Sequence, residues 1–197
     1  DTHPQGPVAV IGTTTWGTTL ALIIARRGIE VRLLARSGKE AIALEAAREH
    51  PRLPGMAFPD TLTVTDDWAN SLDDAAAVLF VVPSHTLREN ARWARPYLSR
   101  GPMVLCATKG IEQGSGKRMS EVLAEEIPQV ADDIGVLAGP NLAREVVRDL
   151  PTSTVIASAS DAVARRAQLL LNSKTFRVYT NSDVIGVELG GALKNVI

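Results

Sequence analysis

Short apolar runs of strand length alternate with amphipathic segments of helix length along almost the whole chain, and this alternation limits the possible folds. The apolar runs are Val8–Ile11, Val31–Ala35, Leu62–Thr65, Ala77–Val82, Met103–Ala107, Ile134–Ala138, Thr154–Ala157 and Phe176–Tyr179. The segments predicted to be helical are Trp16–Arg27, Lys39–Glu49, Ser84–Arg95, Arg118–Glu126, Asn141–Arg148, Asp161–Asn172 and the stretch from Asp183 onward. This order predicts an α/β fold with a doubly wound, mainly parallel sheet and helices on both faces.

The length of 197 residues suits one generous domain and is short for two. We expect residues 1–181 to form the α/β domain. From Asp183 onward apolar residues recur at helical spacing, and the pattern breaks off at Ile197 without a helix stop signal. We therefore expect residues 182–197 to be the first part of a helix that opens a second, helical domain missing from this chain.

Charge and cysteine content narrow the possible partners and location. Lys and Arg number 21 against 22 Asp and Glu, so the formal charge of −1 gives no reason to expect nucleic acid as a partner. Cys106 is the only cysteine and ends an apolar run, which favours an inert core thiol in a reducing compartment. His3, His50 and His85 lack metal-ligand spacing. We expect a cytoplasmic protein without a metal and without membrane insertion.

The segment Gly12–Gly17 joins the first predicted strand to the first predicted helix and resembles the template Gly-x-Gly-x-x-Gly. Gly12 suits the tight turn and Gly17 suits close packing of helix on strand. Thr14 stands in place of the middle glycine, which normally lets the backbone approach a pyrophosphate. Free N–H groups at a helix N-terminus attract phosphate. The segment predicts a dinucleotide site in a Rossmann-like domain, weakened by Thr14 unless threonine hydroxyls bond the phosphate.

The second predicted strand ends in Leu34-Ala35-Arg36-Ser37, where an NAD site usually has an acidic residue for the ribose hydroxyls. An arginine there can meet the 2′-phosphate of NADP or stack on adenine. A solvated surface arginine is the alternative. The expected cofactor is therefore NADP or NAD.

Five segments, in chain order, together resemble the bacterial NAD(P)-dependent glycerol-3-phosphate dehydrogenase family. The segments are Gly12–Leu20, Val82–His85, Thr108–Glu112, Ala138–Ala143 and Glu188–Asn195. The Thr-Lys-Gly-Ile-Glu and Glu-Leu-Gly-Gly-Ala-Leu-Lys-Asn motifs are specific to this family, whereas the glycine loop is shared by many dehydrogenases. This chain departs from the family pattern at Thr14, where the family has glycine, and at Asn141, where it has serine.

The resemblance implies reversible reduction of dihydroxyacetone phosphate to sn-glycerol 3-phosphate, a phospholipid precursor. It implies that Lys194 transfers the proton and that Lys109 serves both the nicotinamide end and the substrate. The implied substrate contacts are Lys109, Gly139, Asn141, Lys194 and Asn195. The implied cofactor contacts are Gly12, Thr14, Thr15, Trp16, Gly17, Arg36, Pro83, Lys109 and Ala143. Because the family holds the substrate phosphate with a C-terminal helical domain, we expect this chain alone to bind nucleotide weakly, to be inactive and to be capable of dimerising.

The flanks of the two lysines support a role in a site, although most lysines are solvated surface charges. Lys109 follows the carboxyl end of an apolar run, where open α/β sheets bind ligands. Lys194 follows Gly190-Gly191, and two glycines inside a helix cost roughly 2 kcal/mol relative to alanines. That cost suggests close backbone approach to the sheet, to a cofactor or to another helix. Two lysines in one site would each disfavour the charge of the other.

Two other classes of protein remain open from the residues alone. One is another two-domain dehydrogenase, such as a 3-hydroxyacyl-CoA or ketopantoate enzyme, which a test with dihydroxyacetone phosphate would distinguish. The other is a non-catalytic nucleotide-binding or interaction module, which Thr14 and the expected missing half favour. Measuring NADPH binding by the chain would test the second.

Overall fold

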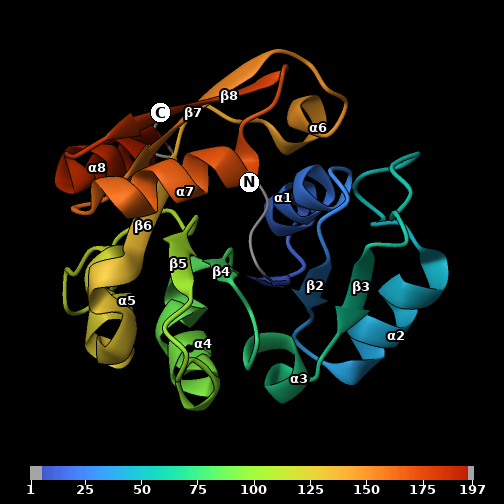
Figure 1. Cartoon of the computed structure of the whole chain (residues 1–197), viewed down its shortest axis with the longest axis horizontal. Coiled ribbons are helices and arrows are strands. Elements are labelled where there is room, and N and C mark those ends of the chain that lie inside the picture. The colour runs from blue at the N-terminus through green and yellow to red at the C-terminus, as the bar shows by residue number, and fades with distance from the viewer. Residues whose placement is uncertain (1–5, 195–197) are drawn as a thin grey trace.

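The apolar runs form the strands of one eight-stranded sheet in the computed structural model, which describes residues 6–194 (Figure 1). The strands are β1 (Val8–Ile11), β2 (Val31–Leu34), β3 (Leu62–Thr65), β4 (Ala77–Phe80), β5 (Met103–Cys106), β6 (Ile134–Ala138), β7 (Thr152–Ala157) and β8 (Phe176–Asn181). Their order across the sheet is β3-β2-β1-β4-β5-β6-β7-β8. The predicted doubly wound α/β fold is confirmed.

Helices cover both faces of the sheet and bury a separate apolar core on each. The α-helices are α1 (Thr15–Ala25), α2 (Gly38–Ala47), α3 (Trp68–Leu72), α4 (Leu87–Ala94), α5 (Met119–Glu126), α6 (Ala143–Val146), α7 (Asp161–Leu171) and α8 (Val184–Leu193). One core contains α1, α2, α6 and α7, and the other contains α3, α4, α5 and α8. Short 3₁₀ turns precede and follow α4, at Ser84–Thr86 and Arg95–Tyr97, and a third spans Pro128–Asp133.

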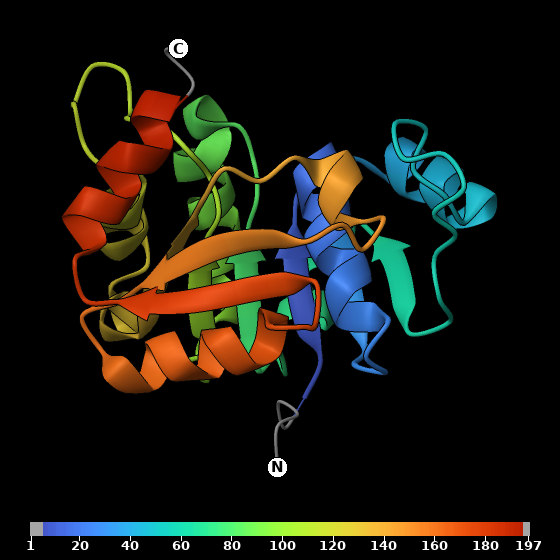
Figure 2. The ribbon, with the colours of Figure 1, turned by 90° about the horizontal axis from the view of Figure 1, so that it is seen from above.

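All neighbouring strands run parallel except β6 and β7, which pair antiparallel through Val136–Ala138 and Val155–Ala157. A mainly parallel sheet was expected, and the single reversal lies away from the first strands. Beyond the reversal, β7 and β8 run side by side as a long parallel pair with α7 against them (Figure 2). The carboxyl ends of β1, β2, β4, β5 and β6 therefore share one edge of the sheet.

The chain crosses over between β1 and β4, and this crossover positions a crevice. After β1 the chain passes through α1 to β2 on one side, whereas after β3 it returns through α3 to β4 on the other. The loops that leave β1 and β4 diverge at the shared edge. In open α/β sheets ligands bind at such a switch point, outside the carboxyl ends of the strands.

Helix α8 docks on the sheet through one of its two consecutive glycines. A Cβ on Gly191 would lie 2.9 Å from the Cβ of Ala138 on β6, whereas a Cβ on Gly190 would meet nothing within 4 Å. The close approach predicted for this pair is therefore made by Gly191, and its partner is the sheet. Val184 and Val187 pack into the core beside it.

The opposite side of α8 is open. Ile185, Leu189 and Leu193 are 55%, 42% and 62% exposed. The apolar residues predicted to share one helical face are thus divided between the core and the surface, because ten residues of helix place them around more than one side. Val196, which belongs to the predicted face, lies outside the described residues.

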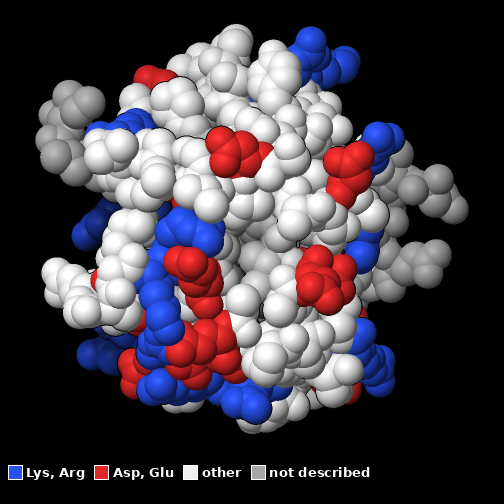
Figure 3. All heavy atoms as spheres, turned by 90° about the vertical axis from the view of Figure 1, so that its left-hand side faces the viewer, with Lys and Arg blue, Asp and Glu red and all other residues white. Residues whose placement is uncertain are grey.

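The face that carries α5 and α8 mixes both signs of charge instead of gathering one sign (Figure 3). Arg88 of α4 forms a cluster of ion pairs with Glu112, Glu125 and Glu126. Beside that cluster Arg118 pairs with Glu188 of α8 at 2.7 Å. These pairs join α4, α5, α8 and the loop after β5. Within residues 6–194, no helix combines the length and the apolar character that crossing a bilayer requires.

Candidate functional site

The loop between β1 and α1 needs glycine at both of its ends. Gly12 has φ +110°, and a Cβ there would lie 2.6 Å from the carbonyl oxygen of Val81 in the strand end next to it. A Cβ on Gly17 would collide with the carbonyl oxygen of Gly12. The two glycines therefore allow the tight turn and the close approach of α1 to β1, as the sequence indicates.

Thr14, which replaces the middle glycine of the template, caps α1. Its φ is −60°, so this position needs no unusual backbone, and a β-branched residue fits without strain. Its hydroxyl oxygen accepts a hydrogen bond from the N–H of Gly17 at 3.0 Å, and its hydroxyl hydrogen is donated to the carbonyl of Val81 at 3.0 Å. The hydroxyl is thus occupied on both sides and ties the loop to the end of β4.

The cap leaves two of the first backbone donors of α1 available. Among the described residues, the N–H groups of Thr15 and Trp16 have no hydrogen-bond acceptor, whereas the N–H of Gly17 is taken by Thr14. Unpaired N–H groups at the first turn of a helix attract anions. The loop therefore retains the feature that binds a phosphate, with one donor fewer than it would have without the cap.

Buried side chains fix the shape of this loop from the side of β2. The hydroxyl of Thr13 donates to Glu40 at 2.7 Å, and the imidazole Nε2 of His50 lies 3.1 Å from the carbonyl oxygen of Thr13. The Nδ1 of His50 accepts from the N–H of Arg52, so Nε2 carries the hydrogen and donates. Burial lowers the pKa of His50, which favours this neutral form. His50 was not among the residues predicted for the site.

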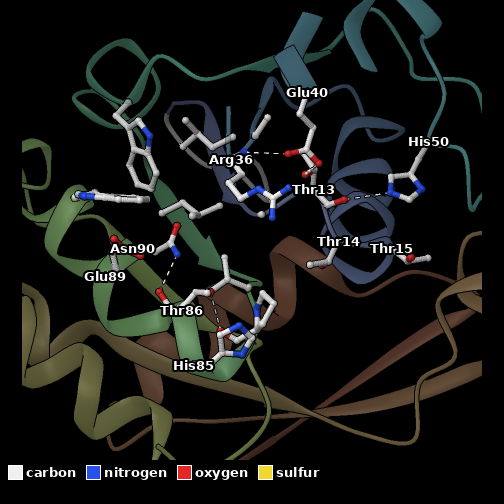
Figure 4. A pocket seen from close by; sticks show the side chains of 18 of the residues that line it. Thr13, Thr14, Thr15, Arg36, Glu40, His50, His85, Thr86, Glu89 and Asn90 are labelled. Carbon is white, nitrogen blue, oxygen red and sulfur yellow. Dashed lines mark hydrogen bonds between the residues drawn. The ribbon is translucent and has the colours of Figure 1, made fainter. Parts of the chain in front are cut away.

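A first cavity of about 460 Å³ opens beside the loop, between the ends of β1, β2 and β4 (Figure 4). Thr13, Thr14 and Thr15 form one wall, and Arg36 lies at the end of β2 with its backbone N–H 3.3 Å from Glu40. The far wall comes from α3 and α4, including Trp68 and Trp93. Arg36 is exposed and has no side-chain ion pair among the described residues.

A second cavity of about 290 Å³ lies on the other side of Thr14, at the ends of β4, β5 and β6. Thr14, Val82 and Pro83 line both cavities, so they stand between the two. The other residues that line the second cavity are Trp16, Val81, Ala107, Thr108, Lys109, Asn141 and Ala143. Nine of the predicted site residues line one cavity or both: Gly12, Thr14, Thr15, Trp16, Arg36, Pro83, Lys109, Asn141 and Ala143. Among the described residues, Gly17, Gly139 and Lys194 line neither.

Two polar atoms at the second cavity are buried without a hydrogen-bond partner. They are Oδ1 of Asn141 and Nε1 of Trp16. The side-chain nitrogen Nδ2 of Asn141 donates to the carbonyl of Ser153 at 2.8 Å, which fixes the amide and leaves its oxygen free. Because buried polar groups are normally paired, an acceptor and a donor left open beside one cavity indicate a site for a polar ligand.

Lys109 and Lys194 come from two distant segments and lie close enough for their charges to interact, although only Lys109 lines the second cavity. The ammonium Nζ of Lys109 donates to the carbonyl of Gly139 at 2.9 Å. Burial lowers the pKa of Lys109, and the positive charge of Lys194 lowers it further. Lys194 itself is exposed at the end of α8, and Asn195 lies outside the described residues. Each of two neighbouring lysines is expected to disfavour the charged form of the other, and this effect is present for Lys109.

A carboxylate that sequence reasoning did not single out fixes α8, and with it Lys194. Glu188 accepts hydrogen bonds from the N–H and the hydroxyl of Ser120, at 2.8 and 2.6 Å, at the start of α5. It also pairs with Arg118. Glu188 stands two turns before Lys194 in a motif already noted, but only the fold shows that α5 is its partner. Among residues 6–194, no group of three or more histidine, cysteine, aspartate or glutamate side chains is arranged to hold a metal ion.

The strand order, the glycine loop at the crossover and the paired cavities define a Rossmann domain of the dehydrogenase class. Residues 7–164 match the family model described as NAD-dependent glycerol-3-phosphate dehydrogenase N-terminus. The chain therefore belongs to the NAD-dependent glycerol-3-phosphate dehydrogenase family and corresponds to its N-terminal region.

Individual relatives agree with this assignment. The chain is 47% identical over 193 residues to glycerol-3-phosphate dehydrogenase [NAD(P)+] of Dehalococcoides mccartyi, covering 96% of this chain and 54% of that protein. It is 45% identical to the Streptomyces griseus protein of the same name, covering 100% of this chain and 58% of that protein. The crystal structure of glycerol-3-phosphate dehydrogenase from Coxiella burnetii superposes with a TM-score of 0.91 at 35% identity, covering 100% of this chain and 59% of that chain. The chain thus spans little more than half the length of these relatives.

Thr14→Gly is expected to tighten dinucleotide binding by about three- to tenfold. The change removes the γ-methyl group from the wall between the cavities and frees the N–H of Gly17 for a phosphate oxygen. A typical hydrogen bond contributes about 0.5–1.5 kcal/mol, which corresponds to roughly two- to tenfold in affinity. Replacing a threonine cap by glycine costs the helix only a few tenths of a kcal/mol. Titration calorimetry of both proteins with NADPH measures the change. Equal or weaker binding by the glycine variant would mean that the threonine hydroxyl bonds phosphate in the complex.

Proposed function

We propose that the protein to which this chain belongs interconverts dihydroxyacetone phosphate and sn-glycerol 3-phosphate, with NADP or NAD as the hydride carrier. The observation that carries the proposal is the position of Lys109 at a cavity next to the glycine loop, where the charge of Lys194 acts on it, in a chain of this family. This chain supplies the dinucleotide site and the proton-transfer groups. Other contacts to the substrate come in part from the segment that the relatives have beyond the region aligned with this chain.

The two cavities suit the two halves of a dinucleotide. Because Thr14 stands between them, a bound pyrophosphate would cross the loop there and meet the free N–H groups of Thr15 and Trp16. Gly12 and Gly17 would permit that approach. The first cavity then takes the adenosine half with Arg36 at the ribose. The second takes the nicotinamide half, with Pro83, Lys109 and Ala143 as its neighbours.

The proposed chemistry divides between cofactor and protein. The cofactor, when bound, supplies the hydride to the ketone carbon, and negative charge develops on the ketone oxygen. Lys194 donates a proton from Nζ to that oxygen, and the ammonium of Lys109 orients the oxygen and stabilises its charge. Because Lys109 is held on the carbonyl of Gly139, its Nζ has a fixed position at the cavity.

The substrate would lie on the groups that converge from β5, β6 and α8. We propose contacts with Lys109, Gly139 and Asn141, together with Lys194 and Asn195. The free Oδ1 of Asn141 is an acceptor suited to a substrate hydroxyl. Serine in the family pattern offers a hydroxyl at the same place, so asparagine keeps a polar contact there with a longer side chain.

The remaining assignments are also proposals. Residues 1–181 form the dinucleotide-binding domain, and residues 182–197 belong to the helix that opens the substrate domain. The protein acts in the cytoplasm on a small-molecule substrate, and a homodimer is possible through the exposed side of α8. Size-exclusion chromatography with light scattering tests the last of these.

Arg36→Asp is expected to shift the preference between NADPH and NADH by tenfold or more toward NADH. The guanidinium stands at the end of β2, free to pair with a 2′-phosphate, and a carboxylate there would instead repel the phosphate and accept from ribose hydroxyls. A charge-assisted hydrogen bond contributes about 1.5–3 kcal/mol, and each 1.4 kcal/mol is a factor of ten. The dissociation constants of both cofactors, measured on wild type and variant, give the ratio. An unchanged ratio would remove Arg36 from the site.

The proposed reaction is tested with the protein that carries this chain and its continuation. NADPH oxidation is followed with dihydroxyacetone phosphate, with 2-ketopantoate and with a 3-ketoacyl-CoA as alternative substrates. We expect turnover with dihydroxyacetone phosphate only. Turnover with either of the others and not with dihydroxyacetone phosphate would assign the protein to a different dehydrogenase reaction.

A further inference from the structure

The end of the first cavity farthest from the lysines carries two tryptophans. Trp68 opens α3 directly after its cap Asp67, and Trp93 lies in the last turn of α4. Their ring centroids are 5.9 Å apart, and the ring planes meet at 75°. The two rings thus meet edge to face, and Trp93 is 47% exposed at the cavity. A large aromatic side chain kept half in solvent beside a cavity is available for a planar ligand.

The polar groups on the same side of α4 are acceptors. Glu89 and Asn90 stand one turn before Trp93 and line the cavity with it. The amide nitrogen of Asn90 donates to the carbonyl of Thr86 at 2.8 Å, so Oδ1 remains as the free atom of that amide. The hydroxyl of Thr86 in turn donates to the carbonyl of Pro83. The carboxylate of Glu89 receives no hydrogen bond from a described residue. Figure 4 shows Asn90 and Thr86 across the cavity from Arg36 and Glu40.

Other charged groups around the cavity do not alter this pattern. Glu40 is occupied by the hydroxyl of Thr13 and the N–H of Arg36. Neutral His50 uses both ring nitrogens on the backbone. Arg36 and Arg52 are the cations that line the cavity. The wall next to Trp93 therefore offers an aromatic surface and, on Glu89 and Asn90, free oxygen acceptors.

We propose that Trp93, Glu89 and Asn90 select the purine base of the cofactor by its 6-amino group. The inference rests on the proposed dinucleotide binding and adds the residues that read the base. The base stacks on Trp93, and its exocyclic amine donates its two hydrogens to Oδ1 of Asn90 and to the carboxylate of Glu89. A 6-oxo purine would place a carbonyl oxygen against these acceptors, leaving them unpaired and mutually repelling.

The orientation of the dinucleotide follows from the two ends of the site. The nicotinamide must lie beside Lys109 and Lys194, because hydride and proton are delivered to one carbonyl. The pyrophosphate crosses the loop at Thr14, so the purine base reaches the first cavity and the end of it that Trp93 lines.

Binding of NADH is compared with binding of reduced nicotinamide hypoxanthine dinucleotide, which differs from NADH only at position 6 of the purine. Calorimetry on the wild-type chain is expected to give at least tenfold weaker binding of the hypoxanthine compound. Trp93→Ala should weaken binding of both compounds about tenfold or more, as for loss of one base-stacking aromatic, and Trp93→Phe should restore most of it. The double variant Glu89→Gln, Asn90→Leu should reduce the preference for NADH to threefold or less.

Tyr179→Ala is the matched control, since Tyr179 is 57% exposed on β8 away from both cavities. Thermal melts of every variant confirm that it is folded. Equal affinity of the wild-type chain for NADH and for the hypoxanthine compound would overturn the inference while leaving dinucleotide binding established. Affinities of the Trp93→Ala variant equal to those of the Tyr179→Ala variant would do the same. If the wild-type chain binds neither compound, the proposed function fails and this inference fails with it.

Discussion

Lys194→Ala should lower kcat by about 10²- to 10⁴-fold. The protein tested contains this chain followed by the further region that its relatives have. That range is typical for loss of a general acid. Lys194 ends α8 next to Lys109 and is absent from the lining of the glycine-loop cavity, so the dissociation constant of NADPH should change little. Removing its charge should also raise the pKa of Lys109, because a neighbouring positive charge disfavours a protonated amine.

Lys174→Ala provides the control for this substitution. Lys174 is exposed in the loop between α7 and β8, so the variant loses an equal charge at a distance from both cavities. Steady-state kinetics and NADPH titration on both variants separate turnover from cofactor binding. A Lys194→Ala enzyme with nearly normal kcat would show that Lys194 is a solvated surface charge, and proton transfer would have to be assigned elsewhere.

A polypeptide of residues 1–197 alone should bind NADPH and yet oxidise it with dihydroxyacetone phosphate at least 10³-fold more slowly than the longer protein. The matched relatives extend well beyond the aligned region, which is 54% of the Dehalococcoides protein. Leu193 and Lys194 at the end of α8 are exposed. Good orientation of bound reactants contributes about 7–11 kcal/mol, and a small phosphorylated ketone needs its phosphate held to gain it.

The two polypeptides are compared at equal concentration with saturating NADPH, and absorbance at the nicotinamide band follows oxidation. Equal cofactor affinity with unequal turnover is the expected pair of results. Comparable turnover would mean that residues 1–197 already hold the triose phosphate, and that the groups around Lys109 and Asn141 suffice for catalysis.

Most of the fold was predictable because apolar runs are its direct cause. Strands buried on both faces must be apolar throughout, and Ala77–Val82 shows this most clearly. The helix Trp68–Leu72 was not predicted, since five residues are too few to show a period. The antiparallel pairing of β6 with β7 was also beyond the sequence, because a short apolar strand carries no mark of its direction.

The candidate site was predictable where a residue type has one physical reason to be present. Gly12 and Gly17 are examples, since any Cβ would meet a neighbouring carbonyl oxygen. Thr14 was harder to interpret, because threonine fits there without strain only if the backbone does not need a positive φ. Only coordinates show that it does not. Glu188 and His50 act through partners distant in sequence, Ser120 and Thr13, so their roles followed from the fold alone.

Direct binding of NADPH to residues 1–197, measured by isothermal titration calorimetry, is the most direct test of the central claim that this chain forms a dinucleotide site. We predict saturable binding of one NADPH per chain, displaced by NADH, because the glycine loop, both cavities and Lys109 lie wholly within the chain. Absence of saturable binding by a folded chain, at ligand concentrations up to the order of millimolar, would contradict it.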